Sequence, residues 1–212
     1  MNADTRIYLG TNIVGINISE NPGRLNLERF QISMSRFSNI RTLNLSKISR
    51  TPADVTLFAP EVIGSWRLEE LFLSGVPLNE PTLESLSGYL KNDMSNNLRV
   101  LELERTNLGG SQVALLLRSM TRVPGEARNL CLNVNDNMLE DGIEKIIDAI
   151  KNNQTPSRLF LRMIEFEDES HFRHLLEALQ LNTTVGNISP GTPTKGGLIA
   201  ILTRLILTFY NA

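Results

Sequence analysis

The chain has 212 residues, of which 41% are hydrophobic and 21% are charged, and its formal net charge is −2. This length is enough for one large domain with a real core, and the composition excludes collagen-like and wholly disordered chains. The weak negative charge argues against a broad basic surface for nucleic acid.

The cysteine content and the apolar runs set the expected location. Cys131 is the single cysteine, so no intramolecular disulfide can form and a reducing, cytoplasmic setting is favoured. The first ten residues carry no signal-peptide pattern. The longest apolar run, over 198–210, is shorter than the roughly 20 residues that cross a membrane, so we expect no membrane span.

A regular spacing of apolar residues runs along the chain. Such residues recur at the first, fourth and sixth positions of short segments that begin 27 to 30 residues apart, near residues 13, 40, 68, 98, 127, 156 and 185. The triplets are Ile13/Ile16/Ile18, Ile40/Leu43/Leu45, Leu68/Leu71/Leu73, Leu98/Leu101/Leu103, Ala127/Leu130/Leu132, Pro156/Leu159/Leu161 and a weaker Val185/Ile188/Pro190. Spacing this constant indicates an internal repeat.

Each unit is predicted to hold one strand and one helix. The last two residues of a triplet alternate with other residues, as in a short strand with one buried face. A polar turn follows, and then apolar residues at helical spacing, as over 83–90, 113–120, 143–150 and 172–179. Asn79 with Thr82, and Asn137 with Glu140, mark two predicted helix starts.

Stacking of these units predicts the fold. One strand and one helix cannot bury their own apolar stripe, whereas stacked units form a continuous core. Because strands pack closer together than helices, the stack bends, with parallel strands on the concave face and helices on the convex face. The predicted fold class is α/β, a horseshoe-shaped solenoid of about six to seven repeats. We expect Leu71, Leu101, Leu130 and Leu159 to be buried in adjacent parallel strands.

The pattern Leu98-x-x-Leu101-x-Leu103, in units of this length, resembles leucine-rich repeats of the ribonuclease-inhibitor-like class. That class includes ribonuclease inhibitor, the Ran GTPase-activating protein, tropomodulin, the CARMIL capping-protein linkers and the repeat arrays of NOD-like receptors. The resemblance implies a leucine-rich-repeat array over 1–192. The class usually carries Asn, Cys or Thr three residues after the last strand leucine, where the side chain ties down the turn.

That turn position is only partly kept in this chain. Thr106 and Asn135 fit it, whereas Ile48, Val76 and Ile164 do not. We therefore expect some turns to be held by packing rather than by a polar side chain.

The segment over 193–212 is predicted to be an apolar helix at an incomplete or atypical end of the array. Its residues from Leu198 to Phe209 leave almost no polar side. A helix that is apolar all round requires cover on all sides. We expect an apolar patch here that favours self-association.

Few residues suggest enzyme chemistry. His171, His174 and Glu177 are spaced three residues apart, so on a helix their side chains point in progressively different directions. Because metal ligands must converge, a solvated helix face is favoured over a metal site. Cys131 on an inner strand and His171 on an outer helix are not expected to reach the contact of about 3 Å that activates a thiol. Gly109-Gly110 lacks the residue order of a phosphate loop. We predict no catalytic residue, no metal site and no cofactor.

The concave face is the predicted binding surface. Residues between and after the strand leucines point to this face, because side chains alternate along a strand. Along the array they change from small and uncharged to acidic and then basic, with two phenylalanines. The predicted partner-binding residues are Glu70, Phe72, Glu102, Glu104, Asn133, Arg158, Phe160 and Arg162. Exposed aromatics flanked by charge are typical of protein interfaces, and the alternative is that the charges only keep the sheet soluble.

Three functional hypotheses follow. The first is a non-enzymatic scaffold that binds a protein partner through the concave face or edge of the horseshoe; by resemblance, the partner is an actin regulator, a small GTPase or a signalling protein. The second is a GTPase-activating protein similar to the Ran-directed family. No motif beyond the repeats matches that family. The third is an array detached from a NOD-like receptor or another multidomain protein.

Overall fold

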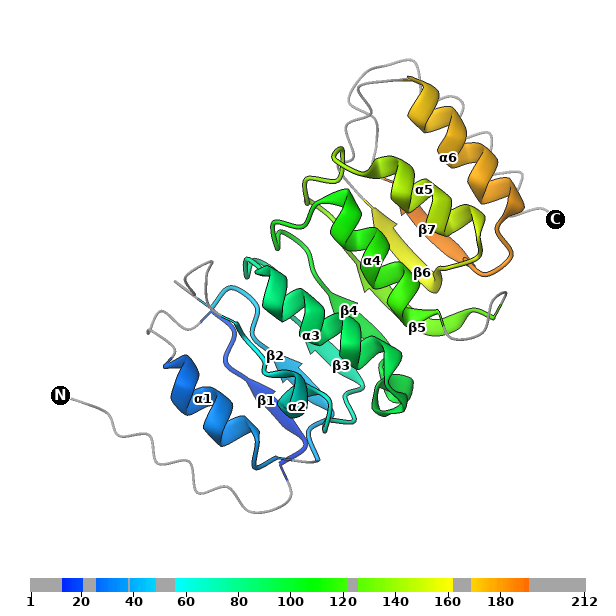
Figure 1. The fold of residues 1–212 in the computed structure, drawn as a ribbon. Helices are drawn as coiled ribbons and strands as arrows, with labels where there is room; N and C mark the ends of the chain where they lie inside the picture. Colours follow the sequence, from blue (N-terminus) through cyan, green and yellow to red (C-terminus); the bar gives the residue numbers. More distant parts are fainter. Residues whose placement is uncertain are drawn as a thin grey trace.

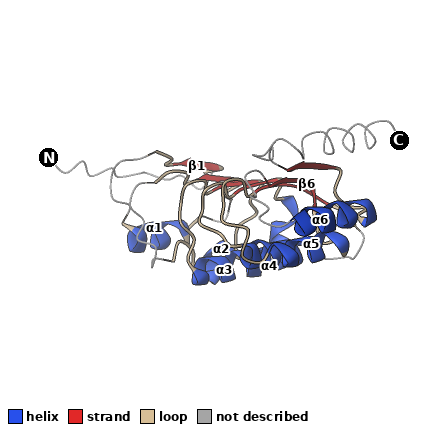
Figure 2. Ribbon diagram, turned by 90° about the horizontal axis from the view of Figure 1, so that it is seen from above, coloured by secondary structure: helices blue, strands red, loops and turns tan. Residues whose placement is uncertain are grey.

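The computed structural model describes residues 13–20, 26–37, 39–48, 56–121, 126–161 and 169–190. These residues form two layers, a parallel sheet and a layer of helices along one of its faces (Figures 1 and 2). The strands follow each other in chain order, and every neighbouring pair is parallel. They are β1 (Gly15–Asn17), β2 (Thr42–Asn44), β3 (Glu70–Phe72), β4 (Val100–Glu102), β5 (Arg128–Asn133), β6 (Pro156–Leu161) and β7 (Asn187–Pro190).

The helices alternate with the strands along the chain. They are α1 (Leu27–Met34), α2 (Pro60–Ile63), α3 (Glu80–Lys91), α4 (Gly110–Met120), α5 (Ile143–Lys151) and α6 (Glu169–Leu181), with a 3-10 helix η1 (Asp93–Asn97) after α3. The predicted alternation of strands and helices, and the parallel sheet, are confirmed. The sheet is open, with β1 and β7 as its edge strands, and the horseshoe curvature stays a prediction. The helix predicted over 193–212 lies outside the described residues.

The core lies between the two layers and follows the strand leucines. Leu43, Leu71, Leu101 and Leu132 are paired in register from β2 to β5, and Leu159 continues the row on β6. All five are fully buried. The expected burial of the strand leucines is therefore confirmed, and the continuous row shows how neighbouring repeats share one core.

The fifth repeat departs from the predicted register. Leu132, rather than Leu130, pairs with Leu101, so the triplet Ala127/Leu130/Leu132 is two residues out of place. The physical reason is that Leu130, Leu132 and Val134 alternate as apolar residues, so both registers bury an apolar pair. β5 is also irregular against β6, since three residue steps from Arg128 to Cys131 face only two steps on β6, which is a β-bulge. Leu130 is buried as well.

The two predicted helix starts have opposite outcomes. Asn79 caps α3, because its Oδ1 accepts the backbone N–H of Thr82 (3.0 Å) and the Thr82 hydroxyl (2.6 Å). The start predicted at Asn137 is wrong, since α5 begins only at Ile143, after Gly142 in the left-handed conformation. Asn137 is used instead in the turn that follows β5.

That turn is built around the side chain of Asn137. This residue is buried and lies three positions after the buried Val134. Its Oδ1 accepts the backbone N–H groups of Thr106 (3.0 Å) and Leu108 (3.0 Å). Its Nδ2 donates to the carbonyl oxygens of Leu103 (2.8 Å) and Val134 (2.9 Å). One side chain thus satisfies four backbone groups from two consecutive repeats.

The prediction that Asn135 holds this turn is wrong. The predicted register was two residues out of place, so the turn position is Asn137 and not Asn135. Thr106 was assigned correctly, and its hydroxyl donates to the carbonyl of Leu103 (2.8 Å). At the same position in the second and third repeats, Ile48 and Val76 are buried. The expectation that packing holds these other turns agrees with their burial.

The repeat is also visible in the backbone after each strand. A residue with positive φ occurs two positions after the core-facing apolar residue that follows each strand in five consecutive repeats: Glu20, Lys47, Gly75, Arg105 and Asp136. Lys47 and Glu20 form an ion pair (2.9 Å), as do Arg105 and Asp136 (2.7 Å). Most of these side chains are exposed, so each pair adds little stability.

The third repeat holds the single tryptophan of the chain, Trp66. It is fully buried and packs edge-to-face against Phe58, with ring centroids 5.8 Å apart. Its indole N–H has no hydrogen-bond partner within the described part of the structure. Among the described residues, apolar packing is what holds this side chain.

Candidate functional site: the open face of the sheet

The face of the sheet opposite the helices, here called the open face, is not covered by any described element (Figure 2). Side chains of alternate strand residues reach it, since their neighbours in sequence are the buried core residues. The register arranges these side chains in rows across the strands. The first row is Gly15, Thr42, Glu70, Val100, Cys131, Arg158 and Asn187, and the second is Asn17, Asn44, Phe72, Glu102, Asn133 and Phe160.

A third row lies where the strands end. It contains Ser19, Ser46, Ser74, Glu104 and Asn135, whose neighbouring backbones are linked by hydrogen bonds between consecutive repeats. Seven of the eight predicted partner-binding residues lie in the three rows, and Arg162 lies outside the described residues. Asn135 was missed as a member of the open face. Asn137, three residues after Val134, matches the turn position of the repeat class that the sequence resembles, and it was the sequence signal that could have corrected the register.

The asparagines of the second row stabilise their own turns. Asn17, Asn44 and Asn133 each accept, through Oδ1, the backbone N–H of the residue two positions later, at 3.0 Å in all three. This Asx-type contact fixes the chain as it leaves the strand. The neutral N-terminal part of the open face is therefore preorganised.

The middle of the open face is acidic. Glu70 accepts a hydrogen bond from the Thr42 hydroxyl (3.3 Å), and Glu102 accepts one from Asn133 Nδ2 (2.6 Å). Burial raises the pKa of Glu102, the Asn133 hydrogen bond lowers it, and the nearby Glu104 carboxylate raises it further. The raised pKa shows that burial and the second carboxylate together outweigh the hydrogen bond, so this part of the face favours a positive charge.

This electrostatic setting predicts a pH-dependent stability. The unfolded chain ionises the Glu102 carboxyl more readily than the folded chain does, so ionisation lowers stability as pH rises from the ordinary value of 4.5 through the raised pKa. We expect Glu102→Gln to raise the free energy of unfolding near neutral pH by no more than about 0.5 kcal/mol. A small rise in the melting temperature measures this gain. The difference should vanish below about pH 4, where both states hold the proton. A variant less stable than the wild type at neutral pH would contradict this balance of charges.

The thiol of Cys131 lies in the first row but is buried between its neighbours. Burial raises its pKa, Arg158 lowers it, and Glu102 raises it, with a net upward direction. The protonated thiol is a poor nucleophile. His171 is on α6 in the helix layer, 3.4 Å from Glu144 on α5, so it does not face the thiol.

Phe72 and Phe160 occupy the second row on β3 and β6, and both are partly exposed. Arg158, two residues before Phe160, is exposed on the same face. The structure thus brings together two aromatic rings, a central carboxylate and a terminal guanidinium on one rigid sheet. Large side chains held on strands lose little conformational freedom on binding, which favours their use in recognition.

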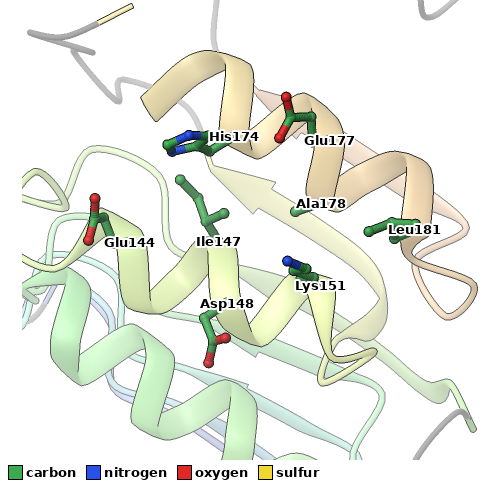
Figure 3. Close-up of a pocket in the computed structure, with 8 residues that line it drawn as sticks. All are labelled: Glu144, Ile147, Asp148, Lys151, His174, Glu177, Ala178 and Leu181. Carbon is green, nitrogen blue, oxygen red and sulfur yellow. The ribbon is translucent and has the colours of Figure 1, made fainter. Parts of the chain in front are cut away.

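The helix layer carries a groove of about 410 Å³ between α5 and α6 (Figure 3). Its lining residues are Glu144, Ile147, Asp148, Lys151, His174, Glu177, Ala178 and Leu181. Asp148 is paired with Arg118 of α4 (3.3 Å). In the described part of the chain, no group of three or more His, Cys, Asp or Glu residues is arranged to hold a metal ion.

Among the described helices, none combines the length and the apolar character needed to cross a lipid bilayer. The described elements define an α/β repeat protein with a seven-stranded parallel sheet, consistent with a leucine-rich-repeat-like solenoid.

Comparison of the sequence with protein-family models and with curated proteins gave no match. Among solved structures, the chain is similar to one described as the tropomodulin C-terminal domain of Caenorhabditis elegans. The two share 16% sequence identity with a TM-score of 0.44, over 95% of this chain and 92% of that one.

Proposed function

We propose that the protein is a non-enzymatic interaction scaffold, a leucine-rich-repeat array of the ribonuclease-inhibitor-like class, that binds a protein partner through its open face. The observation that carries this proposal is the pair of partly exposed aromatics, Phe72 and Phe160, in one row of an uncovered sheet. Aromatic residues are enriched at protein interfaces and supply much of their binding energy.

The surroundings of the two rings support recognition rather than solubility alone. A sheet kept soluble by charge requires only scattered charged residues, whereas here the carboxylates are on β3 and β4 and the guanidinium is on β6. Separated charges of this kind set the orientation of a partner and reject partners of the wrong charge. The hydrogen-bonded turns beneath them keep the face rigid.

Truncation of the two rings tests this function. We expect Phe72→Ala and Phe160→Ala each to weaken partner binding about tenfold or more, because both would be central anchors. Their melting temperatures should change little, since the rings are partly exposed. Affinity purification with the wild-type chain and the double variant, followed by mass spectrometry, would identify partners whose capture depends on the open face.

Leu115→Ala is the matched control, because this exposed apolar residue lies on α4 in the helix layer. It should leave capture unchanged. Binding that survives both phenylalanine variants and is abolished by Leu115→Ala would place the partner on the helices instead and contradict the proposal.

A GTP hydrolysis assay distinguishes the proposed scaffold from the alternative, a GTPase-activating protein. Candidate small GTPases loaded with GTP should hydrolyse it at the same rate with and without the protein. An acceleration that depends on protein concentration would make the chain a GTPase-activating protein and overturn the non-enzymatic part of the proposal.

A further inference from the structure

The spacing and charge of the second row define what kind of segment the open face accepts. Resting on the proposed function, we propose that this face binds an extended peptide segment with the pattern apolar-x-basic-x-apolar, lying across the strands. Its apolar side chains would contact Phe72 and Phe160, and its basic side chain would lie over Glu102 and Asn133 between them.

The distance between the two rings favours an extended segment. Phe72 and Phe160 are in the same row but three strand spacings apart, on β3 and β6. At about 4.8 Å for each spacing, the anchors are about 14 Å apart. In an extended chain, residues i and i+4 face the same side and are about 13–14 Å apart, so they match this distance.

A helical partner matches less well. Residues on one side of a helix recur at i+7 and i+11, which lie about 10.5 Å and 16.5 Å along the axis. The first falls short of the separation of the anchors and the second exceeds it, by about 2–4 Å. The extended segment therefore engages both rings without displacement of either.

The middle residue of the segment would meet a negative surface. The midpoint between the rings falls between β4 and β5, where Glu102 and Asn133 share a hydrogen bond of 2.6 Å. Glu104 and Glu70 occupy the neighbouring rows. Among the described residues, no lysine or arginine forms an ion pair with Glu102 or Glu70, whereas Glu104 lies 3.7 Å from Arg105, so Glu102 and Glu70 are the carboxylates open to a basic side chain from a partner.

A random peptide library displayed on phage and selected on the immobilised full chain tests this inference. We expect enrichment of Lys or Arg at one position, with apolar residues two positions before and two positions after it. A synthetic peptide with that pattern should bind about tenfold more tightly than the same peptide with a central Glu.

Charge reversal on the protein sharpens the test. Glu102→Lys should shift the enriched central residue from Lys or Arg to Asp or Glu. Glu84→Lys is the matched control, because Glu84 is exposed on the helix α3, and it should leave the enriched pattern unchanged. The Phe72→Ala and Phe160→Ala variants should lose the enriched peptides.

The outcomes separate this inference from the proposed function. Peptides that require both phenylalanines but show no central basic residue, or that carry apolar residues at helical spacing, would overturn the inference and leave the open face as a binding surface. Peptides that bind regardless of both phenylalanine variants would overturn the inference and the proposed site together. A selection without any enriched pattern would overturn the inference.

Discussion

Replacing Asn137 by alanine is expected to lower the free energy of unfolding by about 4 kcal/mol or more. The substitution removes the partner of four backbone groups, the N–H groups of Thr106 and Leu108 and the carbonyls of Leu103 and Val134. An unsatisfied buried polar group costs about 1–3 kcal/mol, and these four lie in one turn. Urea unfolding followed by circular dichroism measures the loss.

Two further variants separate the hydrogen bonds from other effects. Asn137→Asp keeps an oxygen that accepts from the two N–H groups but removes the donor to the two carbonyls, so it should destabilise the chain strongly as well. Asn97→Ala removes the same side chain from an exposed position and should change stability by no more than about 0.5 kcal/mol. Equal stability of Asn137→Ala and Asn97→Ala would show that the turn does not depend on this network.

Gly110→Ala is expected to destabilise the chain by about 3 kcal/mol or more, because there is no room for the added methyl group. A Cβ at Gly110 would lie 2.5 Å from the carbonyl oxygen of Leu139 and 2.7 Å from the carbonyl carbon of Gly142. These atoms belong to the backbone of the next repeat, so relief requires the two repeats to move apart. Thermal unfolding of the purified variant measures the cost.

Other glycines provide matched controls. A Cβ at Gly109 would meet neighbouring atoms no closer than 3.8 Å, so Gly109→Ala should cost far less than Gly110→Ala. Gly88 is inside α3, and a methyl group added there would have no neighbour within 4 Å outside its own stretch of helix. Gly88→Ala should therefore stabilise the chain by about 0.5–1 kcal/mol. Similar losses at Gly109 and Gly110 would argue against the close approach of the two repeats.

The strands and their order could be predicted from sequence because burial of a parallel strand imposes a fixed apolar spacing. The register of the fifth repeat was predicted two residues out of place. Leu130, Leu132 and Val134 alternate as apolar residues, so apolar spacing alone allows two registers. Asn137, three residues after Val134, is the local signal for the observed register, whereas no sequence pattern marks the bulge near Arg128.

Cys131 and Asn133 lie on the side of the sheet that was predicted for them despite this error, for a physical reason. The shift is two residues, and side chains on a strand alternate with a period of two, so Cys131 and Asn133 keep their side of the sheet. What the sequence could not provide is the pairing across strands. The hydrogen bond between Glu102 and Asn133, and the raised pKa of Glu102 beside Glu104, depend on which strand positions become neighbours.

The burial of Trp66 determines what a fluorescence experiment on this protein observes. From α2 onward each helix contacts the next helix, and each strand contacts the next strand. Each repeat is therefore stabilised mainly by its immediate neighbours. In such a chain one end can melt while the other persists. The emission of Trp66 therefore reports the cooperative unit that contains the third repeat, while circular dichroism averages over all repeats. A difference between the two unfolding midpoints would measure how far cooperativity extends along the array.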